Sequence, residues 1–376
     1  MNSFINYLEK KLDIEIIESS KFIPYQSTYV TDEQGNVIEL ILKGSTTQDL
    51  IIKDFDILLP LIEHLKKLSI SSAEISKINS IGQFKKLEYL DLGIDSISDF
   101  SKIGQLTNLT YLELSGADIS SNTQFEFLYP LEKLEHLDLS WTEITSIKGL
   151  EKLKNLKKLT LRGSEIKSFN DLSKMPNLTY LNLSGSFYFY DSGLESLAVF
   201  ENLKVLDLSG CHIMTTQGLG KLTKLEQLFL DNTRVEEVVG LESLKNLKLL
   251  ALNNTHLFNI QGLEGLENLR LLHLGNNEHI SKIEGLQGLK NVEIIHLGCT
   301  GITAVEKEHF KGIEKDCIVN FSGVYSLNFI DNELPSNITI AFEYREFSNY
   351  AYYTEDVDQF IDQSKSRLIE EIKGNS

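Results

Sequence analysis

Residues 134–155 read LEHLDLSWTEITSIKGLEKLKN, and the opening block Leu-x-x-Leu-x-Leu of this stretch decides the fold. The block recurs along the chain, most often at intervals of 22 residues, with starts at Leu87, Leu109, Leu134, Leu156, Leu178, Leu203, Leu225, Leu247, Leu269 and Val292. A single unit of this kind cannot bury its own leucines, whereas a stack of units can. The sequence therefore predicts an α/β solenoid whose function lies on a surface rather than in a closed pocket.

Within one repeat, the alternation of side chains assigns each residue to a face. Leu134 and the two leucines that follow it in the block point into the core. His136 and Asp138 flank the middle leucine, so strand alternation sends them to the opposite, solvent-facing side. The glycine and leucine at 149–150 then predict a short helical or 3₁₀ turn on the outer side of the repeat.

A small polar residue stands eight positions after the first leucine of most repeats. These residues are Thr142, Ser164, Ser186, Cys211, Thr233, Thr255, Asn277 and Thr300. A buried backbone group without a partner is costly, so we expect these side chains to form a ladder of hydrogen bonds to the turn that leaves each strand. Cys211 is therefore interpreted as a ladder residue and not as a reactive thiol.

The periodicity resembles the leucine-rich repeat family over roughly residues 37–305. The repeat length resembles the class that contains internalins and phosphatase-regulating subunits, and LSGCHIMTTQGLGKL at 208–222 resembles the cysteine-containing class. The resemblance implies a horseshoe with a parallel β-sheet on its concave face, short helical or 3₁₀ turns on its convex face, and binding of proteins as the usual role.

The two ends of the chain depart from the repeat and predict α/β caps. Residues 1–64 form the N-terminal cap, with a helix from Ser3, a hairpin turning at Gly35 and a degenerate first repeat. Residues 65–317 form the solenoid. Residues 318–376 form the C-terminal cap, with strands followed by a helix that Thr354 caps. A tyrosine-rich second interaction module is the alternative for this last segment.

Composition limits the classes of partner. The net charge of −18 and the pI of about 4.9 argue against a nucleic-acid partner, which needs a basic stripe. A basic protein partner is compatible with this charge, as is a role of the acidity in solubility alone. No apolar run is long enough to predict a membrane span. Three cysteines and the lack of an N-terminal leader pattern predict a reduced, cytoplasmic setting.

Strand alternation also identifies candidate partner-binding residues on the concave face. They are Tyr89, Asp91, Tyr111, Glu113, His136, Asp138, Trp141, Tyr180, Asp207 and Phe229. Three carboxylates fall on successive strands, about 4.8 Å apart, and like charges at this spacing are destabilising. Such a row, with tyrosines and the only tryptophan beside it, predicts an interaction site for a cationic partner, and a merely solvated strand face is the alternative.

Two further surfaces leave alternatives open. An apolar zone contains Val205, Phe229, Leu249, Ala251, Leu271 and Ile294. It is either an exposed interaction patch or a face that the C-terminal segment covers. In the insert FYFY at 187–190, Phe187 or Tyr188 is expected to take the buried isoleucine place of the repeat.

Signatures of catalysis and of metal binding are weak. His273, His296 and Cys299 come close in the predicted register, but no ligand-spacing motif accompanies them. The stacked carboxylates resemble parts of calcium or glycosidase sites without a calcium loop or a closed cleft. We therefore expect no catalytic residues, no metal and no cofactor.

The sequence thus favours a non-enzymatic regulator, inhibitor or recognition scaffold that binds a protein. A surface or adhesion protein that binds host protein or glycan is the alternative, and an enzyme that uses the concave-face carboxylates is the third hypothesis. The oligomeric state is left open.

Overall fold

The computed structural model describes residues 3–21, 23, 25–44, 50–52, 55–75, 77–93, 97, 99–119, 125–324, 326–331, 333–342 and 356–374. The chain forms two compact units. The first comprises Met1–Glu165 with Asp171–Leu178, and the second comprises Ile166–Asn170 with Thr179–Ser376. The boundaries predicted at residues 64 and 317 fall inside these units and stay predictions.

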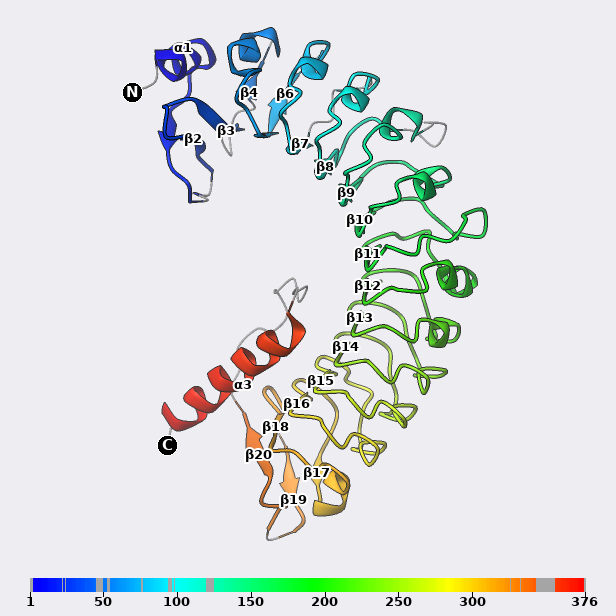
Figure 1. The fold of residues 1–376 in the computed structure, drawn as a ribbon. Helices are drawn as coiled ribbons and strands as arrows, with labels where there is room; N and C mark the ends of the chain where they lie inside the picture. The colour runs from blue at the N-terminus through cyan, green and yellow to red at the C-terminus, as the bar shows by residue number, and fades with distance from the viewer. Residues whose placement is uncertain are drawn as a thin grey trace. The chain divides into compact units, whose positions relative to one another are not determined.

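The first unit is built on short strands that are joined by 3₁₀ turns (Figure 1). Its strands are β1 (Ile16–Glu18), β2 (Ser27–Thr31), β3 (Val37–Lys43), β4 (Leu50–Ile51), β5 (Lys67–Ser71), β6 (Ala73–Glu74), β7 (Tyr89–Gly93), β8 (Tyr111–Glu113), β9 (His136–Asp138) and β10 (Lys158–Thr160). Its helices are α1 (Ser3–Leu12) and the 3₁₀ helices Phe55–Leu61, Ile81–Gln83, Ile103–Gln105, Phe125–Leu128 and Leu150–Lys152. The strand order of its main sheet is β1-β2-β3-β5-β7-β8-β9-β10, and β4 pairs separately with β6.

The N-terminal segment has the elements that the sequence predicts. Helix α1 buries Ile5 and Leu8 on one face. Strands β2 and β3 form an antiparallel hairpin whose turn contains Gly35 at a φ of +80°. Strand β3 then pairs parallel with β5, so the hairpin joins the first repeat directly to the parallel sheet.

The second unit repeats the same architecture. Its strands are β11 (Tyr180–Asn182), β12 (Val205–Asp207), β13 (Gln227–Phe229), β14 (Leu249–Ala251), β15 (Leu271–His273), β16 (Ile294–His296), β17 (Ala304–Val305), β18 (Cys317–Asn320), β19 (Asn328–Phe329) and β20 (Ile338–Ala341). Its helices are α2 (Asp191–Leu194), α3 (Val357–Gly374) and the 3₁₀ helices Glu195–Val199, Leu219–Lys221 and Lys307–Phe310. The main sheet runs from β11 through β16 to β18 and β20, all parallel, and β17 pairs with β19.

The predicted α/β solenoid is confirmed in the register of the strands. Each middle leucine pairs with the middle leucine of the next repeat, as Leu90 does with Leu112 and Leu112 with Leu137. These leucines are at most 2% exposed, so the core of each unit lies on the leucine side of its sheet. None of the helices in the described part of the chain has the length and hydropathy to cross a bilayer.

The predicted polar ladder is present. Thr142, Thr233 and Thr300 each donate a hydrogen bond to the carbonyl oxygen three residues earlier, at 2.6–2.7 Å. The Cys211 thiol is buried and donates to the Leu183 carbonyl at 3.2 Å. Cys211 is therefore a ladder residue, as the sequence indicates.

One expectation from the sequence is wrong, and another falls outside the described residues. In the FYFY insert, Phe189 is fully buried, whereas Phe187 and Tyr188 are 56% and 47% exposed. The longer repeat shifts the phase of the turn, so the third aromatic residue reaches the core. Helix α3 begins at Val357, where Asp356 accepts a hydrogen bond from the Gln359 amide at 2.9 Å. Thr354, predicted as the cap, lies outside the described residues.

Candidate functional site

An acidic and aromatic surface crosses three neighbouring strands of the first unit. We call it the acidic-aromatic tract, and it consists of Tyr89, Asp91, Tyr111, Glu113, His136, Asp138 and Trp141. The register of β7, β8 and β9 places three rings in one row and three carboxylates in the next. All six strand side chains are half-buried and Trp141 is exposed, so these predicted site residues of the first unit share one face.

The aromatic rings of the tract contact one another in a continuous row. Tyr89 and Tyr111 stack face to face with centroids 4.2 Å apart and planes 7° apart. His136 meets Tyr111 edge-on at 5.9 Å. At the Tyr89 end of this row, the Lys67 ammonium lies 4.8 Å from the centre of the Tyr89 ring. These ring contacts hold the phenol rings in a defined arrangement.

Short hydrogen bonds hold the carboxylates. Asp91 accepts from the Ser69 hydroxyl at 2.6 Å and from the Gly93 amide at 3.1 Å. Glu113 accepts from the Tyr111 hydroxyl at 2.9 Å and from the Ser115 hydroxyl at 3.0 Å. The Asp138 carboxylate accepts from the Ser140 amide at 2.8 Å. The acids are thus fixed in place side by side.

Burial, with a smaller contribution from neighbouring like charges, raises pKa values in the tract. Burial and the neighbouring Glu113 raise the pKa of Asp91 to about 6. Burial, with a further contribution from Glu113, also raises the pKa of Asp138. The pKa of Tyr89 rises to about 12 through burial and the charge of Asp91, and the pKa of Tyr111 rises for the same kinds of reason. The tract holds negative charge at a cost that a cation brought close to it would relieve.

This cost predicts a pH-dependent effect of Asp91→Asn. Because the folded state binds the Asp91 proton more tightly than the unfolded chain does, this carboxyl destabilises the fold as pH rises from about 4 to about 6. We expect the variant to raise the free energy of unfolding by about 2 kcal/mol at pH 7 and to leave it nearly unchanged at pH 4. Urea unfolding at both pH values measures this difference. Asp118→Asn, at an exposed site of the same unit, is the control, and an equal effect of Asp91→Asn at both pH values would contradict the assignment.

Trp141 occupies a backbone conformation that bulky residues rarely adopt. The position seven residues after the first leucine is left-handed in repeat after repeat. Glycine or asparagine fills it at Gly116, Gly163, Gly185, Gly210, Asn232, Asn254 and Asn276. Trp141 has a φ of +57° there, and Ser72 and Cys299 are two further residues of other types at this position among the described residues. A left-handed tryptophan costs of the order of 1–3 kcal/mol, and such strain is concentrated at functional sites.

The surroundings of Trp141 fix the direction of its ring. A Cβ atom added to Gly163, the equivalent residue of the next repeat, would lie 2.3 Å from the indole, so only glycine leaves room for the ring. The Arg162 guanidinium lies 5.2 Å from the ring centre. The ring remains 54% exposed, and Trp141 follows Asp138 by three residues in the sequence. Arg162 and Gly163 contact Trp141 but were not predicted as site residues. The glycine and asparagine residues at the equivalent repeat positions could have indicated that Trp141 is unusual.

The other three predicted partner-binding residues lie in the second unit. Asp207 is half-buried and accepts a hydrogen bond from the Ser209 amide at 2.9 Å. Tyr180 and Phe229 are 9% and 3% exposed and belong to a buried apolar cluster that includes residues of α3. The exposure predicted for Phe229 is therefore wrong, because α3 covers it. Of the two alternatives for the apolar zone, the structure shows the covered one.

The two histidines on adjacent strands of the second unit are buried and uncharged. The rings of His273 and His296 meet edge-on at 5.1 Å. Burial lowers the pKa of His273 to about 4, and burial with the neighbouring His273 lowers that of His296. Among the described residues, no cluster of three or more histidine, cysteine or acidic side chains has the arrangement of a metal site.

Comparison with known proteins places the repeats in a described class. Family models of leucine-rich repeats match residues 131–154 (one copy) and 201–243 (two copies). The sequence matches none of the curated proteins with which it was compared.

Solved structures share the fold at low sequence identity. An internalin (inlF) from Listeria monocytogenes str. 4b F2365 is 21% identical, with 72% of this chain and 85% of that chain covered and a TM-score of 0.54. A leucine-rich repeat protein of Leptospira interrogans is 22% identical, with 76% and 79% covered and a TM-score of 0.52. TLR13 in its complex with the RNA ssRNA13 is 23% identical, with 74% of this chain but 43% of that chain covered and a TM-score of 0.59.

Together, the recurring Leu-x-x-Leu-x-Leu block, the parallel strands in register, the polar ladder and the two matched family models identify the chain as a leucine-rich repeat protein.

Proposed function

We propose that the chain is a non-enzymatic binding protein whose acidic-aromatic tract recognises a basic protein partner. The observation that carries the proposal is Trp141, an exposed indole held in a left-handed conformation three residues after Asp138, the last carboxylate of the row. Glycine fits this backbone without that strain, so the tryptophan carries a conformational cost that only its contacts with Arg162 and Gly163 offset within the described part of the protein. An exposed, fixed tryptophan is a frequent energetic centre of protein interfaces.

The charge of the tract supports a cationic group as the part of the partner that is recognised. A lysine or arginine side chain placed between the rings and the acids would contact both the negative faces of the rings and the carboxylates. It would also offset the charge of Glu113, which adds to burial in raising the pKa of Asp91. Two effects therefore favour binding of a cation: its direct contacts with the rings and carboxylates, and the reduced repulsion between the carboxylates.

The net charge distinguishes a protein partner from a nucleic acid. The TLR13 structure contains a single-stranded RNA, so the fold itself is compatible with RNA binding. This chain carries a net charge of −18, and its tract presents carboxylates where a phosphate backbone would need cations.

We further propose a cytoplasmic setting, which suits the free thiols of Cys211, Cys299 and Cys317.

Comparative affinity capture tests the proposal. Wild-type protein, the double variant Tyr111→Ala/Trp141→Gly and the control Phe258→Ala are immobilised and exposed to an extract of the source cells. Phe258 is a suitable control because it is a similarly exposed aromatic residue (57%) in the second unit. We expect a basic protein to be retained by the wild type and the control and lost from the double variant. Equal retention on all three columns would place the binding surface elsewhere.

Electrostatic steering gives a second measurable outcome once the partner is in hand. The association rate constant is expected to fall as salt rises from about 0.05 to 0.5 M, because the Debye length shortens and the acids attract the partner less. The dissociation rate constant should change less over the same range. Stopped-flow measurement separates the two constants, and an association rate that does not respond to salt would argue against a steering role of the carboxylates.

A further inference from the structure

The concave face of the second unit differs from the tract in its side chains and in what covers it. The strand positions before the middle leucine, which carry tyrosines and a histidine in the tract, carry mostly apolar residues here, whereas the positions after it are mixed and include Asp207, His273 and His296. With α3, the apolar residues of both sets form a cluster of buried residues that consists of Tyr180, Val205, Phe229, Leu249, Ala251, Leu271, Ile294, Ile318, Ala341, Val357, Ile361 and Leu368. Nine of these twelve belong to the strands, and we call the apolar strip of the sheet that they form under α3 the groove.

Helix α3 lies on this groove as an amphipathic ligand helix does. In Figure 1 it lies beside the strands of the second unit, and Val357, Ile361 and Leu368 share the buried face at helical spacing. Phe360 and Ile372 are only partly buried against the same cluster. The helix therefore buries three apolar side chains against nine apolar residues of the strands. This arrangement is typical of a helix docked in a groove.

Ion pairs set the position of α3 along the groove. Asp358 accepts hydrogen bonds from Lys248 at 2.5 Å and from Arg270 at 2.7 Å. Arg270 also bonds Asp362 at 2.5 Å. These contacts join residues about 90 to 110 positions apart in the sequence, so they specify one register of the helix on the sheet. The groove thus carries cations where the helix presents acids.

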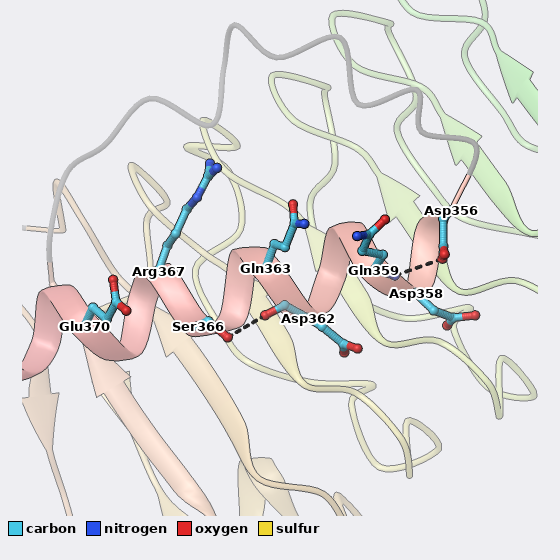
Figure 2. Close-up of a pocket in the computed structure, with 8 residues that line it drawn as sticks. All are labelled: Asp356, Asp358, Gln359, Asp362, Gln363, Ser366, Arg367 and Glu370. Carbon is cyan, nitrogen blue, oxygen red and sulfur yellow. Dashed lines mark hydrogen bonds between the residues drawn. The ribbon is translucent and has the colours of Figure 1, made fainter.

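In the middle of α3, a further ion pair has the opposite polarity, with the cation on the helix. Lys365 donates to Glu293 at 2.9 Å and to the Asp316 carbonyl at 2.7 Å. The Asp358 and Asp362 side chains are 47% and 65% exposed. Solvent and salt therefore reach the ion pairs that these two aspartates form with Lys248 and Arg270. The outward side of α3 is polar, as Figure 2 shows for Gln359, Gln363, Arg367 and Glu370. Solvent-exposed pairs of this kind confer specificity more than strength.

We propose that this groove is a binding site for an acidic amphipathic helix of another protein, and that α3 occupies it in cis until such a helix displaces it. The incoming helix presents apolar residues in the places of Val357, Ile361 and Leu368 and acids in the places of Asp358 and Asp362. Covalent attachment gives α3 a high effective concentration at the groove, so the tethered helix excludes weak competitors.

The test separates α3 from its tether after the protein has folded. A recognition sequence for a site-specific protease is inserted within 343–355, the purified full chain is cut, and a fluorescent peptide of residues 356–376 is added. We expect the peptide to exchange with the severed helix and to bind the cut protein at least 10-fold more tightly than the uncut protein. Anisotropy measures both affinities, and circular dichroism checks that the sheet stays folded. The groove is never empty in this design, since one helix or the other occupies it.

Peptide variants test whether exchange uses the observed contacts. Asp358→Asn in the peptide is expected to weaken binding about 3-fold, as the loss of partly exposed ion pairs does, and Ile361→Asp to abolish it. Glu370→Gln, on the outward polar side in Figure 2, is the matched control and should bind as the parent peptide does. Absence of exchange in the cut protein would overturn the proposal and make α3 a fixed part of the core. Equal binding of all peptides would overturn it as well, because the groove would then lack specificity.

Discussion

Replacing Trp141 with glycine is expected to weaken binding of the basic partner by at least about 2 kcal/mol, roughly 30-fold, and to leave the protein as stable as before. The loss in affinity follows from removal of an exposed indole that is held against Arg162 and Gly163 in the turn after Asp138. The stability follows from two opposed terms. Glycine relieves the left-handed strain at a φ of +57°, while the contacts of the ring with Arg162 and Gly163 disappear.

Isothermal titration measures the affinity, and urea unfolding measures the stability, which should change by less than about 1 kcal/mol. Trp141→Asn should behave as Trp141→Gly does, because asparagine occupies three equivalent positions in other repeats. The agreement of the two variants would assign the effect to the indole and not to a freer backbone. A large loss of stability in both variants with unchanged affinity would make Trp141 a structural residue and remove the main support for the proposed function.

Replacing Asn277 with alanine is expected to destabilise the second unit by about 3–5 kcal/mol. The Asn277 amide group donates to the carbonyl oxygens of Leu252, Leu274 and Gly275 at 2.8–3.2 Å. Its oxygen accepts from the Thr255 amide at 2.9 Å and from the Thr255 hydroxyl at 2.7 Å. The side chain is 1% exposed, so alanine leaves several buried backbone groups without partners and without access to water.

Two matched variants separate these contributions. Asn277→Thr places at this rung the residue that Thr233 and Thr300 provide in other repeats, so it should recover part of the loss. Thr300→Ala removes a single hydrogen bond at 2.7 Å and should cost about 1–2 kcal/mol. Urea unfolding followed by circular dichroism ranks the three variants. If Asn277→Ala costs no more than Thr300→Ala, the ladder contributes far less than its geometry implies.

Much of the tract could be predicted from the sequence because its physical basis is local and periodic. The 22-residue repeat sets which strands are neighbours, and the two-residue period of a strand sets which side chains share a face. These two rules suffice to bring Asp91, Glu113 and Asp138 side by side, as the register of β7, β8 and β9 does. The strain at Trp141 was also predictable from the sequence, since glycine or asparagine occupies its repeat position in most other repeats.

The 25-residue repeat with the FYFY insert shows where a periodic rule fails. Extra residues change the path of the turn, so the spacing alone does not say which aromatic side chain enters the core. Phe189 is buried, and the neighbouring Phe187 and Tyr188 are exposed. The choice depends on close packing with rings from other parts of the unit, such as Phe169 at 6.0 Å.

The sequence by itself determined the stacking of the repeats, the polar ladder and the residues of the acidic-aromatic tract, because each follows from the spacing of a few residue types. Only the tertiary structure decided that α3 covers the apolar groove and removes Phe229 from solvent. An amphipathic helix specifies that one of its faces must be buried, but not against what. That choice lies in the ion pairs of Asp358 with Lys248 and Arg270, about 90 to 110 residues away, and no local pattern encodes contacts at such a distance.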